Sequence, residues 1–121
     1  MPIVIDHLGR MSFTKGTDQP GFKLMLDPLK EPNRGMLLCN DDHFSTPPHP
    51  WSDTIAYARA FVEAAPDRVI WATDWPHLRY LRKMPNDADL LDLLFSCVPD
   101  AATRKKISVD DPARLFGFGT A

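Results

Sequence analysis

Three short apolar runs alternate with segments of helical character, and this alternation constrains the fold more than any other feature of the sequence. The runs lie at residues 2–5, 36–40 and 68–73. Consecutive apolar residues on both faces are typical of strands buried in a parallel sheet. Helices between consecutive strands imply right-handed βαβ crossovers. The sequence therefore predicts an α/β fold with three parallel strands, which is too few to close a barrel.

Helical spacing and capping residues predict the other elements. A short helix is expected at residues 20–30, interrupted by Pro28, and a longer one at 55–65 with Ser52 or Asp53 as its cap. The remaining expectations are helices capped by Asn86, Asp100 and Asp111, the last with Pro112 at its first position and Gly117 beyond its end, and loops over residues 40–51 and 74–86.

Composition narrows the function classes. A chain of 121 residues is the size of one small domain. Its net charge of -2 does not indicate the basic surface that nucleic-acid-binding proteins use. No apolar run approaches the roughly 20 residues that span a bilayer, and the N-terminus lacks a signal-peptide pattern. Cys39 and Cys97 lie beside apolar residues without metal-type spacing, so we expect two buried thiols in a reducing cytoplasm, although the sequence leaves a disulfide open.

Polar side chains follow each predicted strand. Asp6 and His7 follow the first strand, and Asp74 with His77 follows the third. The second strand leads into the polar residues 40–43. Because the carboxyl ends of parallel strands meet at one edge of a sheet, these groups are expected to converge. A carboxylate can accept a proton from water, and an imidazole can bind a metal or polarise a carbonyl. Turn-capping aspartates and solvated loop charges are the alternatives.

Three motifs resemble the amidohydrolase-related family. They are VIDHLGR at 4–10, APDRVIWATDWPH at 65–77 and DDPARLFGF at 110–118. The family comprises TIM-barrel hydrolases and decarboxylases, and the chain is most similar to the dicarboxylate lactonase type (2-pyrone-4,6-dicarboxylate lactonase and its relatives). The resemblance implies that the chain holds strands six to eight of a (β/α)8 barrel, an incomplete barrel.

The resemblance also implies roles for two residues. His7 matches the sixth-strand histidine that contacts the substrate or, in metal-dependent members, the metal. Asp74 matches the eighth-strand aspartate that acts as general base for the attacking water. A divalent ion such as Zn²⁺ is possible in complete relatives, with His7 and Asp74 as the candidate ligands here. The His-x-His pair of the family's first strand is absent from this sequence.

Four further residues are candidates for substrate binding. His77 ends the third-strand motif and is expected to support the site, and His43 follows the divergent second strand. Arg10 and Arg79 are candidates for selecting a substrate carboxylate. The lysine and the small Ser-Gly turn that the family usually has near the second strand are missing here, so the role of the 36–45 segment stays open.

The resemblance leaves two hypotheses about what the chain does. The first is the C-terminal part of a hydrolase for lactone or carboxylate small molecules, which is inactive until a complementing N-terminal half joins it. The second is a non-catalytic remnant that is stable because it self-associates, since its strand edges would otherwise be open. Apart from these two, a third possibility is a homodimer that builds a barrel-like assembly with a new site containing two copies of His7, Asp74 and His77.

Overall fold

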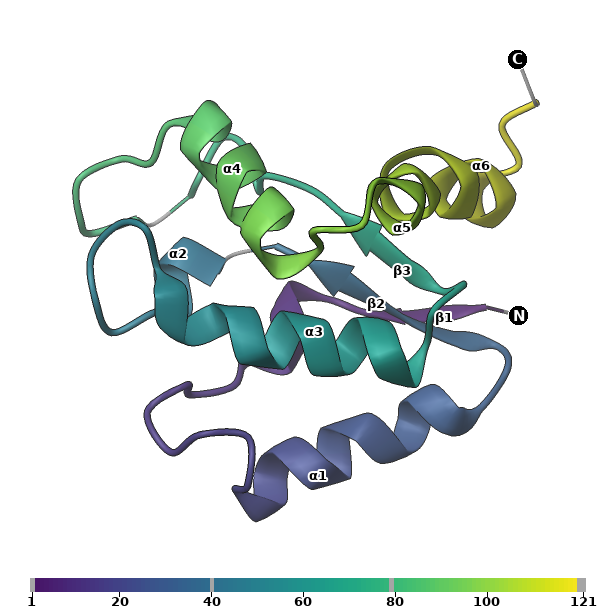
Figure 1. The fold of residues 1–121 in the computed structure, drawn as a ribbon, viewed down its shortest axis with the longest axis horizontal. Helices are drawn as coiled ribbons and strands as arrows, with labels where there is room; N and C mark the ends of the chain where they lie inside the picture. Colours follow the sequence, from purple (N-terminus) through teal and green to yellow (C-terminus); the bar gives the residue numbers. More distant parts are fainter. Residues whose placement is uncertain (1, 40, 79, 120–121) are drawn as a thin grey trace.

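A sheet of three parallel strands lies at the centre of the computed structural model, which describes residues 2–39, 41–78 and 80–119 (Figure 1). Strand β1 spans Ile3–Ile5, β2 spans Arg34–Leu38 and β3 spans Val69–Trp71, in the spatial order β1-β2-β3. The predicted α/β fold with parallel βα units, an incomplete barrel, is confirmed. Strand β2 begins at residue 34 rather than 36 and ends at residue 38.

Helical segments connect and follow the strands. The segment 20–30 is helical throughout but changes to a tighter 3-10 helix at Pro28, as the interruption predicts. The helices are η1 (His7–Arg10), α1 (Pro20–Leu26), η2 (Asp27–Lys30), α2 (Asp41–Phe44), η3 (Ser52–Thr54), α3 (Ile55–Ala64), α4 (Asp87–Cys97), α5 (Ala101–Lys105), η4 (Lys106–Asp110, a π-helical turn) and α6 (Asp111–Phe116).

Two predicted caps are confirmed. The side chain of Asn86 accepts a hydrogen bond from the Ala88 N–H at the start of α4, and that of Asp100 accepts one from the Thr103 N–H in α5. Each cap satisfies one of the backbone donors that a helix start leaves without an intrahelical partner. Gly117 ends α6 with a left-handed φ of 71°, as expected of a residue without a Cβ.

Three local predictions are wrong. Neither Ser52 nor Asp53 caps α3: the Asp53 carboxylate instead accepts hydrogen bonds from the Ser45 hydroxyl and the Thr46 N–H. Asp111 does not cap α6, because η4 continues into it without exposing a new helix start. Residues 41–44 form the short helix α2 instead of a loop, and Phe44 in it packs edge-on against Phe13 at 6.4 Å between ring centroids.

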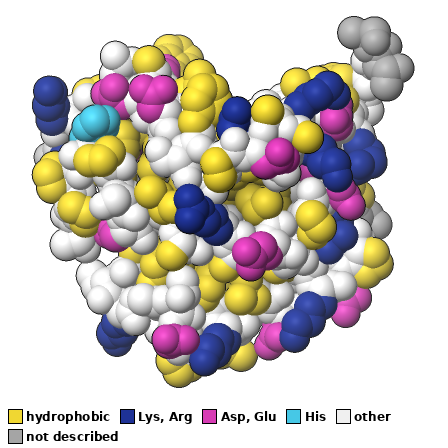
Figure 2. Space-filling view, in the orientation of Figure 1, with side chains coloured by type: hydrophobic (Ala, Val, Ile, Leu, Met, Phe, Trp, Pro, Cys, Tyr) yellow, Lys and Arg dark blue, Asp and Glu magenta, His cyan; other side chains and the backbone are white. Residues whose placement is uncertain are grey.

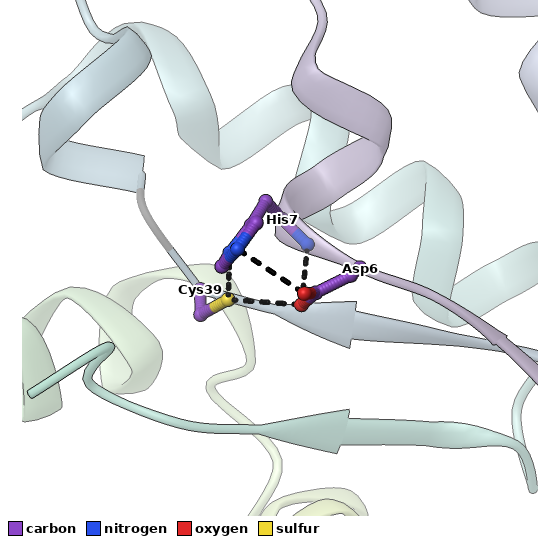
Figure 3. Close-up of side chains that lie close together, drawn as sticks. All are labelled: Asp6, His7 and Cys39. Atoms are coloured by element: carbon purple, nitrogen blue, oxygen red, sulfur yellow. Dashed lines mark hydrogen bonds and ion pairs between the residues drawn. The ribbon is translucent and has the colours of Figure 1, made fainter.

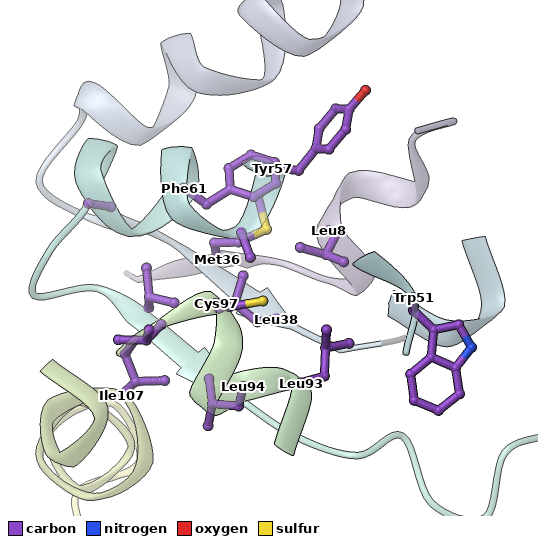
Figure 4. Packing of buried hydrophobic residues seen from close by; sticks show 14 of the residues in the cluster. Leu8, Met36, Leu38, Trp51, Tyr57, Phe61, Leu93, Leu94, Cys97 and Ile107 are labelled. Carbon is purple, nitrogen blue, oxygen red and sulfur yellow. The ribbon is translucent and has the colours of Figure 1, made fainter. Parts of the chain in front are cut away.

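The hydrophobic core lies on one face of the sheet, between the strands and helices α1, α3 and α4 (Figures 1 and 4). An edge-to-face aromatic contact joins two of these helices: the ring centroids of Phe22 in α1 and Phe61 in α3 are 5.2 Å apart. Phe61, Met36 and Val69 are fully buried. Burial of this face fixes the order of the strands and thereby the place where their carboxyl ends meet.

The opposite face of the sheet is only partly covered. Val4, Leu37 and Ile70 line a hollow of about 420 Å³ together with Leu115 and Phe116 at the end of α6. In a closed barrel this face is the interior, which side chains from all the strands fill. Among the described residues, β1 and β3 each pair on one side only.

The molecular surface mixes both signs of charge. On the face in Figure 2, Lys and Arg side chains alternate with Asp and Glu, with hydrophobic side chains between them. This mixture agrees with the small net charge of -2. In the part of the chain that the structure describes, no helix has both the length and the apolar character needed to cross a membrane.

Candidate active site

The turn after β1 places His7 at the carboxyl edge of the sheet. The Asp6 carboxylate accepts a hydrogen bond from the His7 N–H at 2.9 Å, and the Gly9 N–H donates to the Asp6 carbonyl at 2.9 Å. His7, Leu8 and Arg10 have φ values of 50–52°, a left-handed conformation that costs a non-glycine residue about 1–3 kcal/mol. Full burial of Leu8 holds the turn in place.

Gly9 is required in this turn for two reasons. Its φ is +68°, and a Cβ at this position would lie 2.6 Å from the methyl carbon of Met25. A larger residue would therefore adopt a strained φ and would require the end of the Met25 side chain to move.

His7 is the hub of the site. Its Nδ1 lies 3.0 Å from the Cys39 sulfur, and its Nε2 lies 3.1 Å from Asp6 Oδ2 (Figure 3). The same Nδ1 lies 3.8 Å from Asp74 Oδ1. The Cys39 thiol is also 3.7 Å from Asp6 Oδ1. The predicted pair His7 and Asp74 is thus brought together from the two outer strands, across the end of β2.

Asp74 lies on a turn with a left-handed φ of 67°, which directs its side chain toward His7. The turn is closed by the His77 N–H, which donates to the Asp74 carbonyl at 2.8 Å, and the Asp74 side chain remains 27% exposed. A partly exposed carboxylate next to an imidazole can reach both solvent water and a bound molecule. That combination suits a general base.

His77 lies apart from this hub. Its side chain is buried, and its Nε2 is 3.0 Å from Asp87 Oδ1 at the start of α4. This contact ties the loop after β3 to α4 and so fixes the position of Asp74 three residues earlier. The predicted contact between His77 and substrate stays a prediction.

An open hollow of about 520 Å³ lies beside His7 and Asp74. Two other predicted residues, Arg10 and His43, contribute to its wall, whereas Arg79 lies outside the described residues. The hollow thus combines a carboxylate with basic and apolar groups. Its lining residues are His7, Arg10, His43, Phe44, Asp74, Trp75, Pro76 and Leu78.

Asp42 is a buried carboxylate behind this hollow, not a solvated loop charge. Its side chain is 1% exposed, and neither carboxylate oxygen has a hydrogen-bond partner among the described residues. Burial raises the pKa of Asp42, and the nearby His77 and Tyr80 offset part of this effect. Tyr80 meets hydrogen-bond geometry only with the Asp42 backbone carbonyl, at 3.5 Å. Burial and the Asp42 charge together raise the pKa of Tyr80.

Sequence reasoning missed the position of Cys39. The residue is buried, as expected, but it lies against His7 instead of in the apolar core. The signal was its place directly after β2, between strand ends that carry Asp6 and Asp74. Asp6, His7 and Cys39 together offer ligand atoms within 4.8 Å of one another.

A second hollow, of about 270 Å³, lies at the amino ends of the strands, and no histidine lines it. Its Arg68 donates to the backbone carbonyls of Arg34 at 2.9 Å and Leu29 at 2.8 Å. These contacts tie chain segments together, so we assign this region to stability and the opposite edge to chemistry.

Comparison of sequences identifies relatives of this chain. The model of the amidohydrolase family (Amidohydro_2) matches residues 1–118. The 4-sulfomuconolactone hydrolase of Hydrogenophaga intermedia is 45% identical over 119 residues, which cover 97% of this chain and 39% of that enzyme. The 2-pyrone-4,6-dicarboxylate hydrolase of Comamonas testosteroni is 36% identical, over 94% of this chain and 40% of that enzyme. The chain spans about two-fifths of the length of these relatives.

Solved structures show the same fold. The apo crystal structure of an Agrobacterium tumefaciens protein superposes with a TM-score of 0.83 at 30% identity, over 98% of this chain and 42% of that one. A putative 2-pyrone-4,6-dicarboxylic acid hydrolase from Pseudomonas putida superposes with a TM-score of 0.82 at 25% identity, over 100% of this chain and 45% of that one.

Proposed function

Because this chain belongs to the amidohydrolase family, we propose that it supplies the C-terminal part of the active site of a lactone hydrolase. The observation that carries the proposal is the approach of His7 Nδ1 to Asp74 Oδ1, at 3.8 Å, beside an open hollow. Two relatives are named as hydrolases of 4-sulfomuconolactone and of 2-pyrone-4,6-dicarboxylate. These names support a substrate class of cyclic esters that carry an acidic group.

In the proposed reaction, Asp74 acts as the general base. Its carboxylate takes a proton from a water molecule while the water oxygen attacks the lactone carbonyl carbon. The bond between that carbon and the ring oxygen then breaks, and the ring oxygen leaves as a hydroxyl by taking back from Asp74 the proton that the water had given up. His7 lies with Nε2 beside the Asp6 carboxylate, so when both ring nitrogens carry a proton its Nδ1–H can donate a hydrogen bond to the carbonyl oxygen as negative charge develops on it.

Arg10 and His43 are proposed to bind the acidic group of the substrate. Both contribute to the wall of the hollow that holds His7 and Asp74. A guanidinium can hold a carboxylate or sulfonate through two parallel hydrogen bonds, which would fix the lactone ring relative to Asp74. His77 acts by positioning, through its contact with Asp87.

The family implies that a divalent ion such as Zn²⁺ can serve at this edge, and the donor types here fit one. His7 Nδ1 and Asp74 Oδ1 are 3.8 Å apart. Two nitrogen or oxygen ligands of a tetrahedral zinc ion are about 3.4 Å apart, which is only slightly shorter. When bound, such an ion would polarise the lactone carbonyl. Asp74 keeps its role as base in either case.

The proposed partner is a polypeptide that supplies the other βα units. The chain spans about two-fifths of its relatives, and the sheet face lined by Val4, Leu37 and Ile70 is only partly covered. The loop after β3 also exposes apolar side chains next to the site, with Trp75 at 75% and Leu81 at 96%. A second copy of this chain is the alternative partner and would correspond to the non-catalytic remnant.

We propose that this activity is located in the cytoplasm. Cys39 and Cys97 are buried thiols and Cys39 contacts His7, and cysteines that are not in disulfides are typical of reducing compartments.

Complementation tests the proposed function. The chain is assayed on both lactones, alone and after coexpression with the part of the Hydrogenophaga relative that it does not match. We expect turnover only in the complex, and Asp74→Asn should lower kcat by about 100-fold or more because general bases contribute that much. Asp92→Asn, on the exposed side of α4, is the matched control.

Two results would count against this function. The first is turnover that Asp74→Asn leaves unchanged. The second is a stable, folded complex that hydrolyses neither lactone, which would support the non-catalytic alternative.

A further inference from the structure

We propose that Asp6, His7 and Cys39 bind a borderline-soft divalent cation of the Zn²⁺ type, with the Cys39 thiolate as one of the protein ligands. This proposal does not depend on the hydrolase function: an ion held here would take His7 Nδ1 as its ligand, and His7 would then act through the ion and not as a hydrogen-bond donor or as a ligand shared with Asp74. The residues lie at the ends of the adjacent strands β1 and β2, both within this chain, so the site needs no partner (Figure 3).

The distances between donor atoms support a shared ion. Zinc bonds of about 2.3 Å to sulfur and about 2.0–2.2 Å to nitrogen or oxygen give tetrahedral edges of about 3.6 Å. The Cys39 sulfur lies 3.7 Å from Asp6 Oδ1, which agrees with this edge. It lies 3.0 Å from His7 Nδ1, so the imidazole has to withdraw slightly when an ion enters.

The charges of the three groups also suit a divalent ion. The Cys39 thiol points toward the Asp6 carboxylate, where it can donate its proton. A cation that displaces this proton would face one thiolate, one carboxylate and one neutral imidazole, whose summed charge neutralises it. A sulfur, a nitrogen and an oxygen donor together favour zinc over magnesium or calcium, which prefer oxygen alone.

The burial of Cys39 favours a role as metal ligand over a role as a nucleophile that attacks the substrate. Cys39 is 3% exposed and is not among the residues that line the hollow beside Asp74, so a lactone carbonyl in that hollow does not reach its sulfur. The His7 side chain is 20% exposed and the Asp6 side chain 57%, which leaves a path for an ion and an open coordination position. Three protein ligands with one open position are the usual arrangement of catalytic zinc sites.

The strained backbone of η1 prepares this geometry before an ion binds. His7 and Leu8 adopt left-handed φ values of 50° and 51°, and this turn brings the His7 ring over the end of β2. Backbone strain of this kind persists where the surroundings determine it, and it is concentrated at functional sites.

Cobalt spectroscopy tests the site. The tag-free chain is titrated with Co²⁺, and we expect a thiolate-to-cobalt charge-transfer band in the near ultraviolet that added Zn²⁺ removes. The band should be absent in Cys39→Ser and retained in Cys97→Ser, a matched change at the other buried cysteine. Asp6→Asn should weaken Zn²⁺ binding about tenfold or more, since even outer-shell changes cost 10–100-fold.

Asp6→Asn is also expected to remain folded, because the amide oxygen of the asparagine can still accept the hydrogen bond from the His7 N–H. Circular dichroism and thermal unfolding of each variant verify the fold. A band that persists in Cys39→Ser, or folded wild-type protein that binds Co²⁺ without the band, would overturn the proposal. So would rapid acylation of Cys39 by a lactone, which would make it a nucleophile. Asp74→Asn should keep the band, so failure of the hydrolase function and failure of this site are distinguishable.

Discussion

Replacement of Asp42 by asparagine should stabilise the protein at neutral pH. Asp42 is 1% exposed, and its carboxylate oxygens have no hydrogen-bond partner among the described residues. The asparagine side chain keeps the shape of a protonated aspartate and removes the ionisable group. The free energy of unfolding should rise by about 1–3 kcal/mol, because at neutral pH the folded protein no longer has to bury a charged carboxylate or keep it protonated, and each unit of raised pKa costs about 1.4 kcal/mol. For a domain of this size each kcal/mol corresponds to about 3–6 °C in Tm.

The pH dependence of this gain follows from the direction of the pKa change. Burial raises the pKa of Asp42 above the ordinary 3.8, so the folded protein binds this proton more tightly than the unfolded chain does. The contribution of Asp42 to stability is then fully present below 3.8 and is lost as the pH rises through the folded pKa. Each pH unit in this window is worth at most about 1.4 kcal/mol, so the gain at about pH 7 has a ceiling of about 4 kcal/mol.

Urea unfolding of both proteins, followed by circular dichroism over a series of pH values, measures this difference. It should be near zero in acid and should grow toward neutral pH. Asp111→Asn is the control: Asp111 is also buried with a raised pKa, but Arg114 donates to its Oδ1 at 2.6 Å. The asparagine oxygen can still accept this bond but no longer carries the charge that strengthens it, so the gain at neutral pH should be smaller than that of Asp42→Asn by about 1 kcal/mol. If Asp42→Asn is destabilising at neutral pH, or its effect does not change with pH, the reasoning is refuted.

Three further predictions concern packing, the η1 turn and association. Phe61→Ala should lower the free energy of unfolding by about 3–5 kcal/mol in urea titrations, since Phe61 is fully buried, whereas Leu81→Ala, at 96% exposed, should change it by less than about 0.5 kcal/mol. Gly9→Ala should cost about 1–3 kcal/mol because φ is +68° and Met25 blocks the Cβ, whereas Gly21→Ala, in open space within α1, should gain about 0.4–1 kcal/mol. The purified chain should self-associate in sedimentation at micromolar concentration through its open strand edges, and a monodisperse monomer there would contradict this expectation.

The sequence predicted the order and direction of the elements because burial determines both. Each apolar run contains a strand, and Asn86 and Asp100 cap helices through hydrogen bonds to backbone groups two and three residues further along the chain. Asp53 failed as a cap for a reason that local sequence does not contain. Its carboxylate is held by Ser45 and Thr46, which a proline-rich loop folds back onto it.

The candidate site was predictable in part for the same reason. Parallel strands placed His7 and Asp74 at one edge, and their approach to 3.8 Å follows from that topology. The burial of Asp42 was not predictable, because it depends on how α2 packs beneath Tyr80. His77 was expected to support the site, but the sequence does not indicate its contact with Asp87, ten residues further along the chain.

The middle strand explains how two residues from outer strands can meet at all. Adjacent strands lie about 4.8 Å apart, so the ends of β1 and β3 are separated by about twice that distance. A bulky side chain at the end of β2 would fill this space and keep His7 from Asp74. Cys39 is small enough to let the imidazole lie over it, and its sulfur contacts His7 Nδ1 at 3.0 Å. The end of β2 therefore leaves room for His7 and Asp74 to approach, and Cys39 adds a donor atom of its own beside them.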